Sequence, residues 1–358
     1  MSRRGKAVHP CPPRAIYTGP VTDIQDFIHR LPKAELHLHL EGTIRPETLV
    51  ELSARHDALP LTLHDAQALY RFTDFTEFME CFKAVTRRLS DPEDFELVAW
   101  RMMQQLHAQG IVHAEVYISV GVLYLWHNFD PLCFEPIFAA LERARERAAR
   151  AFGLSLFWIF DAVRHFTVEE AERVFLKAAE LRPLYPSIIG IGLGGDERLQ
   201  GSEAFRAHYA RARAAGLRLT NHAGETTGPE AIWEALSIGS ERLGHVFSAI
   251  QDEQLLLNLK ARAVPLELNP TSNLRTGVCD SFAAHPLRRY FDRGLLVTLN
   301  SDDPAFFGSD LAHEFFLAHT HQGFTRDELR RLAANSFRSS FLPEAEKAHW
   351  LARIDTLE

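Results

Sequence analysis

Eight short apolar runs alternate with helical stretches between residues 31 and 303, and this alternation limits the possible folds more than any other feature of the chain. Runs that are apolar at nearly every position are typical of strands buried on both faces, as in parallel sheets. Parallel strands separated by helices indicate an α/β fold. The predicted strands are Leu31–Glu41, Ile111–Ser119, Leu154–Val163, Ile188–Gly195, Leu217–Gly224, Arg242–Val246, Pro265–Pro270 and Leu296–Asp303.

Eight such units predict a (β/α)8 barrel with extra helices. The alternative is a doubly wound open sheet, but that fold usually has fewer strands, and no Gly-x-Gly-x-x-Gly turn follows an early strand here. We expect residues 1–20 to form an N-terminal arm and residues 21–358 to form one barrel domain. The predicted helices are Thr22–Leu31, Arg45–Arg55, Glu96–Gln109, Pro136–Ala151, Val168–Leu181, Ser202–Ala215, Pro229–Leu236, Asp252–Ala261, Pro286–Asp292, Asp310–Thr320 and Arg326–Ser340.

Composition narrows the class of protein. The 358 residues are 46% hydrophobic, which is ample for a large core. A net charge of -8 argues against general affinity for nucleic acid or for an anionic membrane. We find no apolar run of the roughly 18 residues that a membrane span needs. The four cysteines are scattered and form no Cys-x-x-Cys pair, which fits a reducing compartment, and we expect a cytoplasmic protein.

The first predicted strand carries two histidines, His37 and His39, in the stretch LPKAELHLHLE. Residues i and i+2 of a strand point to the same face, so the two imidazoles project together. Imidazole pairs suit zinc, copper, iron or nickel. Two polar residues on an exposed strand would give the same pattern, so this motif alone leaves both interpretations open.

Three further strand ends carry ionisable residues: His222-Ala-Gly-Glu225, His245 and Asp302-Asp303. Each alone has an ordinary explanation, such as a hydrogen-bonded histidine or an aspartate in a turn. In a barrel, however, the carboxyl ends of the strands meet at one mouth, where the chemistry lies. Several imidazoles with one carboxylate are typical of a catalytic zinc site. Zinc makes hydroxide available at neutral pH, and a nearby glutamate could deliver a proton.

Taken together, PKAELHLHLEG, NHAGE, RLGHV and LNSDDP resemble the motifs of the adenosine deaminase family, a branch of the amidohydrolase superfamily. They run from residue 32 to residue 304 in the family's order. The resemblance implies a (β/α)8 barrel that hydrolytically replaces the 6-amino group of a purine by oxygen and releases ammonia. It also implies one zinc ion per chain, held by His37, His39, His222 and Asp302.

The same resemblance assigns roles around the substrate. Glu225 would protonate ring nitrogen N1, and His245 would orient and activate the attacking water. Asp303 would hydrogen-bond N7, and the backbone N–H of Gly195 would contact N3. His39 is in addition a substrate-binding candidate, and Asp302 a catalytic one. Because protonation of N1 removes charge that attack would otherwise build up, Glu225 must arrive protonated while Asp302 stays ionised.

Two departures concern the sugar side of the substrate. Vertebrate-type adenosine deaminases place an aspartate at the position of Glu41, where it contacts the ribose 5′-hydroxyl. The stretch NPTSNLRTG resembles bacterial relatives that act on adenine or on aminodeoxyfutalosine. A cationic Arg275 could pair with the carboxylate that aminodeoxyfutalosine has and adenosine lacks. The candidates for sugar-side contacts in this stretch are Thr271, Ser272, Asn273 and Arg275. For each of them the alternative is a place in a polar loop.

The leading hypothesis is zinc-dependent deamination of adenosine to inosine, with a small 6-aminopurine as partner and neither nucleic acid nor membrane involved. The alternatives are deamination of aminodeoxyfutalosine, an intermediate of menaquinone biosynthesis, or of adenine. Hydrolysis of another amide, amidine or phosphoester is less favoured, because strand 4 ends in Gly194-Gly195-Asp196 without the lysine of binuclear relatives. A catalytically dead binding barrel is disfavoured by the complete set of motif residues. We also expect the aromatic segment Tyr70–Phe82 to border the pocket.

Overall fold

The computed structural model describes residues 23–128, 130 and 132–357, so the predicted arm at residues 1–20 lies outside the described residues. Within them, eight parallel strands pair in chain order. The strands are β1 (Lys33–His39), β2 (Ile111–Ile118), β3 (Ser155–Val163), β4 (Ile188–Gly194), β5 (Arg218–Ala223), β6 (Arg242–His245), β7 (Leu266–Leu268) and β8 (Val297–Leu299).

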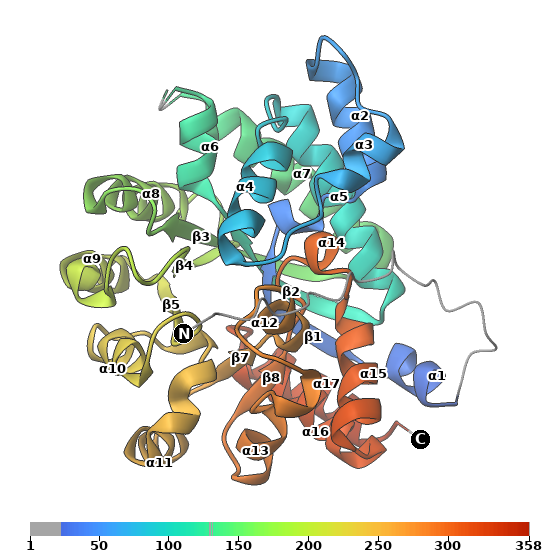
Figure 1. Ribbon diagram of the computed structural model, residues 1–358, viewed down its shortest axis with the longest axis vertical. Helices are drawn as coiled ribbons and strands as arrows, with labels where there is room; N and C mark the ends of the chain where they lie inside the picture. Colours follow the sequence, from blue (N-terminus) through green and yellow to red (C-terminus); the bar gives the residue numbers. More distant parts are fainter. Residues whose placement is uncertain (1–22, 129, 131, 358) are drawn as a thin grey trace, which may run out of the picture.

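The last strand returns to the first. Leu38 and Asp302 form a bridge, and the N–H of His39 donates to the carbonyl of Asp302 over 3.0 Å. The sheet therefore closes on itself, with helices in a ring around it (Figure 1). The predicted (β/α)8 barrel is confirmed, and the open doubly wound sheet is excluded.

The helices form the outer layer of the barrel and cap its mouth (Figure 1). They are α1 (Asp23–Arg30), η1 (Glu41–Thr43), α2 (Pro46–His56), α3 (Leu63–Ala68), α4 (Phe75–Thr86), α5 (Pro92–Ala108), α6 (Val120–Trp126), α7 (Phe134–Phe152), α8 (Val168–Leu181), η2 (Ser202–Phe205), α9 (Arg206–Ala214), α10 (Pro229–Ser237), η3 (Phe247–Gln251), α11 (Glu253–Ala261), α12 (Pro270–Arg275), η4 (Phe282–Ala284), α13 (Leu287–Asp292), α14 (Pro304–Phe307), α15 (Leu311–Gln322), α16 (Arg326–Ser339) and α17 (Glu344–Asp355), where η marks a 3-10 helix.

The segment after β7 differs from the sequence prediction. The interpretation of NPTSNLRTG as a polar loop is wrong, because α12 spans Pro270–Arg275. Proline suits the first position of a helix, since its ring fixes φ at a helical value and it needs no N–H partner there. The helix turns Ser272 and Asn273 into the protein, where both are buried.

The interior of the barrel contains a chain of buried charges beneath the mouth. Arg242 on β6 forms ion pairs with Glu115 on β2 and Glu267 on β7, and all three side chains are fully buried. Glu267 in turn contacts Nδ1 of His37 over 2.7 Å. Removing one partner of such a buried pair typically costs about 3–5 kcal/mol. These pairs therefore fix the position of His37.

None of the described helices is both long enough and apolar enough to cross a lipid bilayer.

Candidate active site

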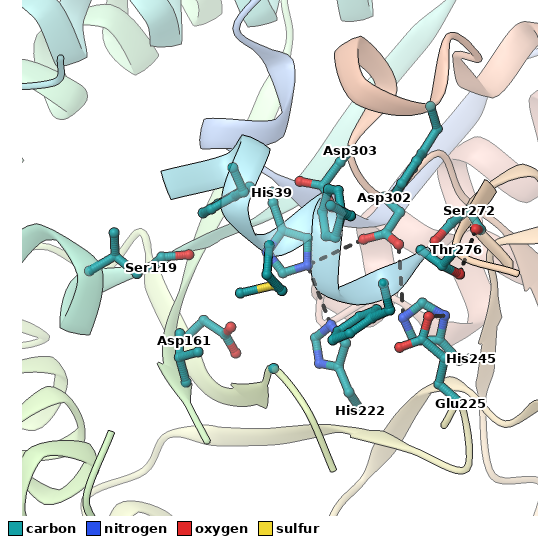
Figure 2. A pocket seen from close by; sticks show the side chains of 18 residues that line it. His39, Ser119, Asp161, His222, Glu225, His245, Ser272, Thr276, Asp302 and Asp303 are labelled. Atoms are coloured by element: carbon teal, nitrogen blue, oxygen red, sulfur yellow. Dashed lines mark hydrogen bonds and ion pairs between the residues drawn. The ribbon is translucent and has the colours of Figure 1, made fainter. Parts of the chain in front are cut away.

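A cavity lies at the carboxyl ends of the strands, where a barrel of this kind carries its chemistry (Figure 2). Helix α4 contributes an apolar wall made of Phe75, Phe78, Met79 and Phe82, so the aromatic segment does border the pocket as expected. The polar residues that line the cavity are His39, Ser119, Asp161, His222, Glu225, His245, Ser272, Thr276, Asp302 and Asp303.

The four residues predicted to bind metal converge at the base of this cavity. The Nε2 atoms of His37 and His39 each lie 3.4 Å from Oδ1 of Asp302. The Nε2 atoms of His39 and His222 lie 3.3 Å apart. Ligand atoms placed about 2.0–2.1 Å from a tetrahedral zinc ion are separated from one another by about 3.3 Å. These three spacings are those of ligands around a tetrahedral zinc ion, and His37, His39 and Asp302 form one group whose ligand atoms all lie within 4.8 Å of one another.

Hydrogen bonds behind two of the imidazoles fix which nitrogen faces the cluster. Nδ1 of His37 contacts the Glu267 carboxylate, and Nδ1 of His222 lies 3.1 Å from the carbonyl oxygen of Leu193. Both Nδ1 atoms therefore carry the proton, which leaves the Nε2 lone pairs free for a metal. Nε2 of His37 is buried and makes no hydrogen bond, although Oδ1 of Asp302 lies 3.4 Å away. A buried polar atom without a partner is unfavourable unless it binds something.

The charges at the cluster also call for a cation. Burial opposes protonation of His37, yet the carboxylates of Asp302 and Glu267 raise its pKa to about 10. Burial lowers the pKa of His39 to about 4, so this imidazole is neutral. Despite its own burial, Asp302 has a pKa well below the usual range because His37 lies beside it. The two carboxylates beside His37 thus favour a positive charge at this place, which a divalent ion bound to deprotonated imidazoles would supply.

His245 lies within reach of the same cluster. Together with His37 and His222 it forms a second group whose ligand atoms lie within 4.8 Å of one another. Its Nε2 is 3.9 Å from Oδ2 of Asp302, and burial lowers its pKa to about 3. A neutral imidazole in this place has a lone pair that could accept a proton from water, if an ion bound to the cluster held one.

We expect Glu267→Gln to weaken zinc binding by about 10- to 100-fold, the usual effect of losing the partner that orients a ligating histidine. Competition between the protein and a zinc-binding dye would measure the change. Glu142→Gln provides the matched control, because Glu142 is also buried and accepts hydrogen bonds from Trp158 and Ser187 on the outside of the barrel. Equal zinc affinity in the wild type and in Glu267→Gln would contradict this role.

Glu225 lies beside the cluster and is nearly buried. Its Oε1 lies 3.6 Å from Nδ1 of His245 and accepts from the amide of Asn273 over 3.4 Å. Burial raises the pKa of Glu225 well above its usual range, and the charge of Asp302 adds to the shift. Its backbone N–H donates to Oε1 of Glu197 over 2.7 Å, which fixes the turn after β5. A carboxyl group that holds its proton more tightly than usual therefore lies at the cavity, close to one that holds its proton less tightly.

Four other predicted site residues divide into two groups. Asp303 and Gly195 line the cavity, and Gly195 has a φ of +83°, which favours glycine. Glu41 and Arg275 lie outside the cavity lining. Glu41 is buried and accepts the N–H of Ser119 over 2.9 Å, while the guanidinium of Arg275 lies 5.1 Å from the ring centre of Phe72. Their substrate contacts stay predictions.

The sequence indicated no role for Asp161 or Glu267 and a different role for Asn273. Asp161 and Glu267 were visible only as single acidic residues inside the apolar runs LFWIFDAV and PLELNP. An acidic residue inside an apolar run indicates that a partner is buried with it, because a charged residue is almost never fully buried without one. Asn273 was named only as a sugar-side candidate, whereas here it contacts Glu225 and His245.

The known proteins that this chain resembles are deaminases and amidohydrolases. The family model described as adenosine deaminase matches residues 32–357. Aminodeoxyfutalosine deaminase of Streptomyces avermitilis is 37% identical over 337 residues, which is 93% of each chain. The crystal structure of adenine deaminase from Arthrobacter aurescens superposes with a TM-score of 0.84 at 33% identity, covering 91% of this chain and 98% of that one. An amidohydrolase from Burkholderia ambifaria with bound Zn has a TM-score of 0.85 at 26% identity, covering 96% of both chains.

Proposed function

This chain belongs to the adenosine deaminase family and is a hydrolytic deaminase of aminopurines, and from this premise we propose that it uses one zinc ion to deaminate aminodeoxyfutalosine. The observation that carries the zinc proposal is the set of 3.3–3.4 Å separations among His37, His39, His222 and Asp302. The relative named aminodeoxyfutalosine deaminase supports the substrate. The family match supports a single deaminase domain over residues 21–358.

In this proposal the ligands are His37, His39, His222 and Asp302. A zinc ion bound there would activate water for attack at neutral pH. His245 holds the water against C6 of the purine and accepts one of its protons.

Glu225 donates its proton to N1 of the purine. The ring is otherwise a poor electrophile, because attack at C6 would leave negative charge on N1. Asp303 hydrogen-bonds N7, and the backbone N–H of Gly195 hydrogen-bonds N3. These contacts hold C6 over the cluster. Over one turnover, water supplies the oxygen at C6, one proton for N1 and one proton for the ammonia that leaves.

The names of the relatives favour aminodeoxyfutalosine or adenine over the adenosine expected from the sequence motifs. Adenine is the second candidate, supported by the Arthrobacter adenine deaminase, whose chain this one matches over 98% of its length. A comparison of kcat/KM for aminodeoxyfutalosine, adenine and adenosine, followed by purine ultraviolet absorbance, tests the proposal. We expect aminodeoxyfutalosine to be used best. A higher kcat/KM for adenine would establish the second candidate.

The carboxylate of aminodeoxyfutalosine gives a separate test. Arg275 carries a buried Nε without a hydrogen-bond partner, and we propose that its guanidinium pairs with this carboxylate. We expect Arg275→Ala to lower kcat/KM for aminodeoxyfutalosine by about 10- to 100-fold, the effect of losing one charge-assisted hydrogen bond. Adenine serves as the internal control, because it has no carboxylate. Equal losses for both substrates would remove Arg275 from substrate recognition.

A further inference from the structure

We propose that Asp161 binds a hydrogen-bond donor on the N9 side of the purine, opposite Glu225. The donor is the N9–H of a free base or a hydroxyl of the sugar attached to N9. This inference rests on the proposed function, because it uses the orientation in which N1 faces Glu225. It assigns to Asp161 a role in substrate specificity.

Asp161 is a carboxyl group built into the wall of the cavity. It lies on β3, lines the cavity and is only 2% exposed. Its Oδ1 is buried and has no hydrogen-bond partner. Nearly all buried polar atoms have such a partner, so an unpaired carboxyl oxygen at a cavity wall indicates that a ligand supplies one. Burial also raises the pKa of Asp161 well above its usual range.

The neighbouring strand leaves space for this side chain. Asp161 pairs with Gly192 in the register of β3 and β4. A Cβ atom at Gly192 would lie 2.5 Å from Oδ1 of Asp161, and a Cβ atom at Gly194 would lie 2.8 Å from Oδ2. Any side chain at either position would therefore displace the carboxyl group. The two glycines therefore leave room for the carboxyl group beside the cavity.

The chemistry of the purine ring connects Asp161 to N9. In the six-membered ring, C4 lies directly opposite N1, and N9 is attached to C4. If N1 faces Glu225, N9 and its substituent point to the other side of the cavity. Figure 2 shows Asp161 and Ser119 on that side, with His39 and His222 between them and Glu225. The carboxyl group of Asp161 is thus the acceptor that a donor on the N9 side would meet.

A metal-binding role is the competing explanation for an acidic side chain here. Among the described residues, Asp161 belongs to none of the groups whose ligand atoms lie close enough to share an ion. Its carboxyl group lies beside the glycines of β4. Loss of Asp161 should therefore change substrate recognition and leave the zinc content unchanged.

The test uses Asp161→Leu, which has a similar shape but no polar atom, and Asp161→Asn, which keeps one acceptor oxygen. Substrates are compared in pairs that differ by one donor: adenine with 9-methyladenine, and adenosine with 2′-deoxyadenosine and 3′-deoxyadenosine. We expect Asp161→Leu to lower kcat/KM about 10- to 100-fold for the substrate that carries the donor, mainly through a higher KM. The kcat/KM of the substrate that lacks the donor should stay the same. Asp161→Asn should restore most of the loss.

The pair that responds identifies the donor as N9–H or as a sugar hydroxyl. Equal losses for both members of every pair, or a lower zinc content, would overturn the proposal and give Asp161 a structural role. Failure of the proposed function has a different signature, which is a wild-type protein that turns over none of the 6-aminopurines. Calorimetric binding of hypoxanthine and 9-methylhypoxanthine gives a second readout that does not depend on turnover.

Discussion

Replacing Glu225 by glutamine is expected to lower kcat by about 10²- to 10⁴-fold, the range that a positioned general acid contributes. Glutamine has nearly the same shape and can still hydrogen-bond N1, but it cannot transfer a proton to it. Asn273 and Glu197, which contact the side chain and the backbone at this position, would still hold the turn. KM should therefore change little, because the loss is confined to the transition state.

The measurement is steady-state kinetics on the best substrate, together with zinc content and thermal unfolding. Glu230→Gln is the matched control, since Glu230 is exposed at the start of α10, five residues further along the chain. Wild-type kcat in Glu225→Gln would show that another group donates the proton. A lower zinc content in this variant would mean that Glu225 supports the metal instead.

Asp302→Asn is expected to weaken zinc binding by more than about 100-fold. Loss of a residue that only hydrogen-bonds a metal ligand costs up to about 100-fold, and loss of a ligand itself should cost more. The variant should also lose turnover when zinc is limiting. In the proposed site Asp302 would provide the anionic ligand atom, and its Oδ1 lies 3.4 Å from Nε2 of both His37 and His39. Its backbone has a φ of +63°, which asparagine tolerates better than most residues. The substitution therefore removes charge without new backbone strain.

Zinc content after dialysis and a competitive zinc titration measure this effect. Asp303→Asn is the contrasting variant, because Asp303 lines the cavity next to Asp302 but is predicted to contact the purine. It should keep its zinc and lose kcat/KM. Full zinc occupancy in Asp302→Asn at low free zinc would rule out Asp302 as a ligand.

Much of the fold could be predicted because each strand is short, apolar and followed by helical sequence. The barrel geometry then brings the carboxyl ends of the strands together without any further information. This is why His37, His222 and Asp302, which lie far apart in the sequence, could be placed at one site. The residue types that bind metals and transfer protons are few, and they stand out at the ends of apolar runs.

The remaining site residues could not be predicted, because their roles depend on contacts between strands. The role of Glu267 depends on its contacts with His37 and Arg242, and that of Asp161 depends on its position beside the glycines of β4. The short strands β7 and β8 show the same limit. Both strands are shorter than the apolar runs predict, and the chain continues toward α12 and α14. Tertiary contacts at the mouth outweigh the local strand preference there.

The buried charges beneath the mouth have a consequence for how the proposed zinc ion would bind. His37 is held by Glu267, and Glu267 by Arg242, through contacts that involve no metal. We therefore expect the proposed ligands to be in place without zinc, unlike those of small zinc domains, which fold only when the metal binds. Loss of zinc to a chelator should be a change of occupancy in an intact barrel. Activity should return when zinc is added back, without a refolding step.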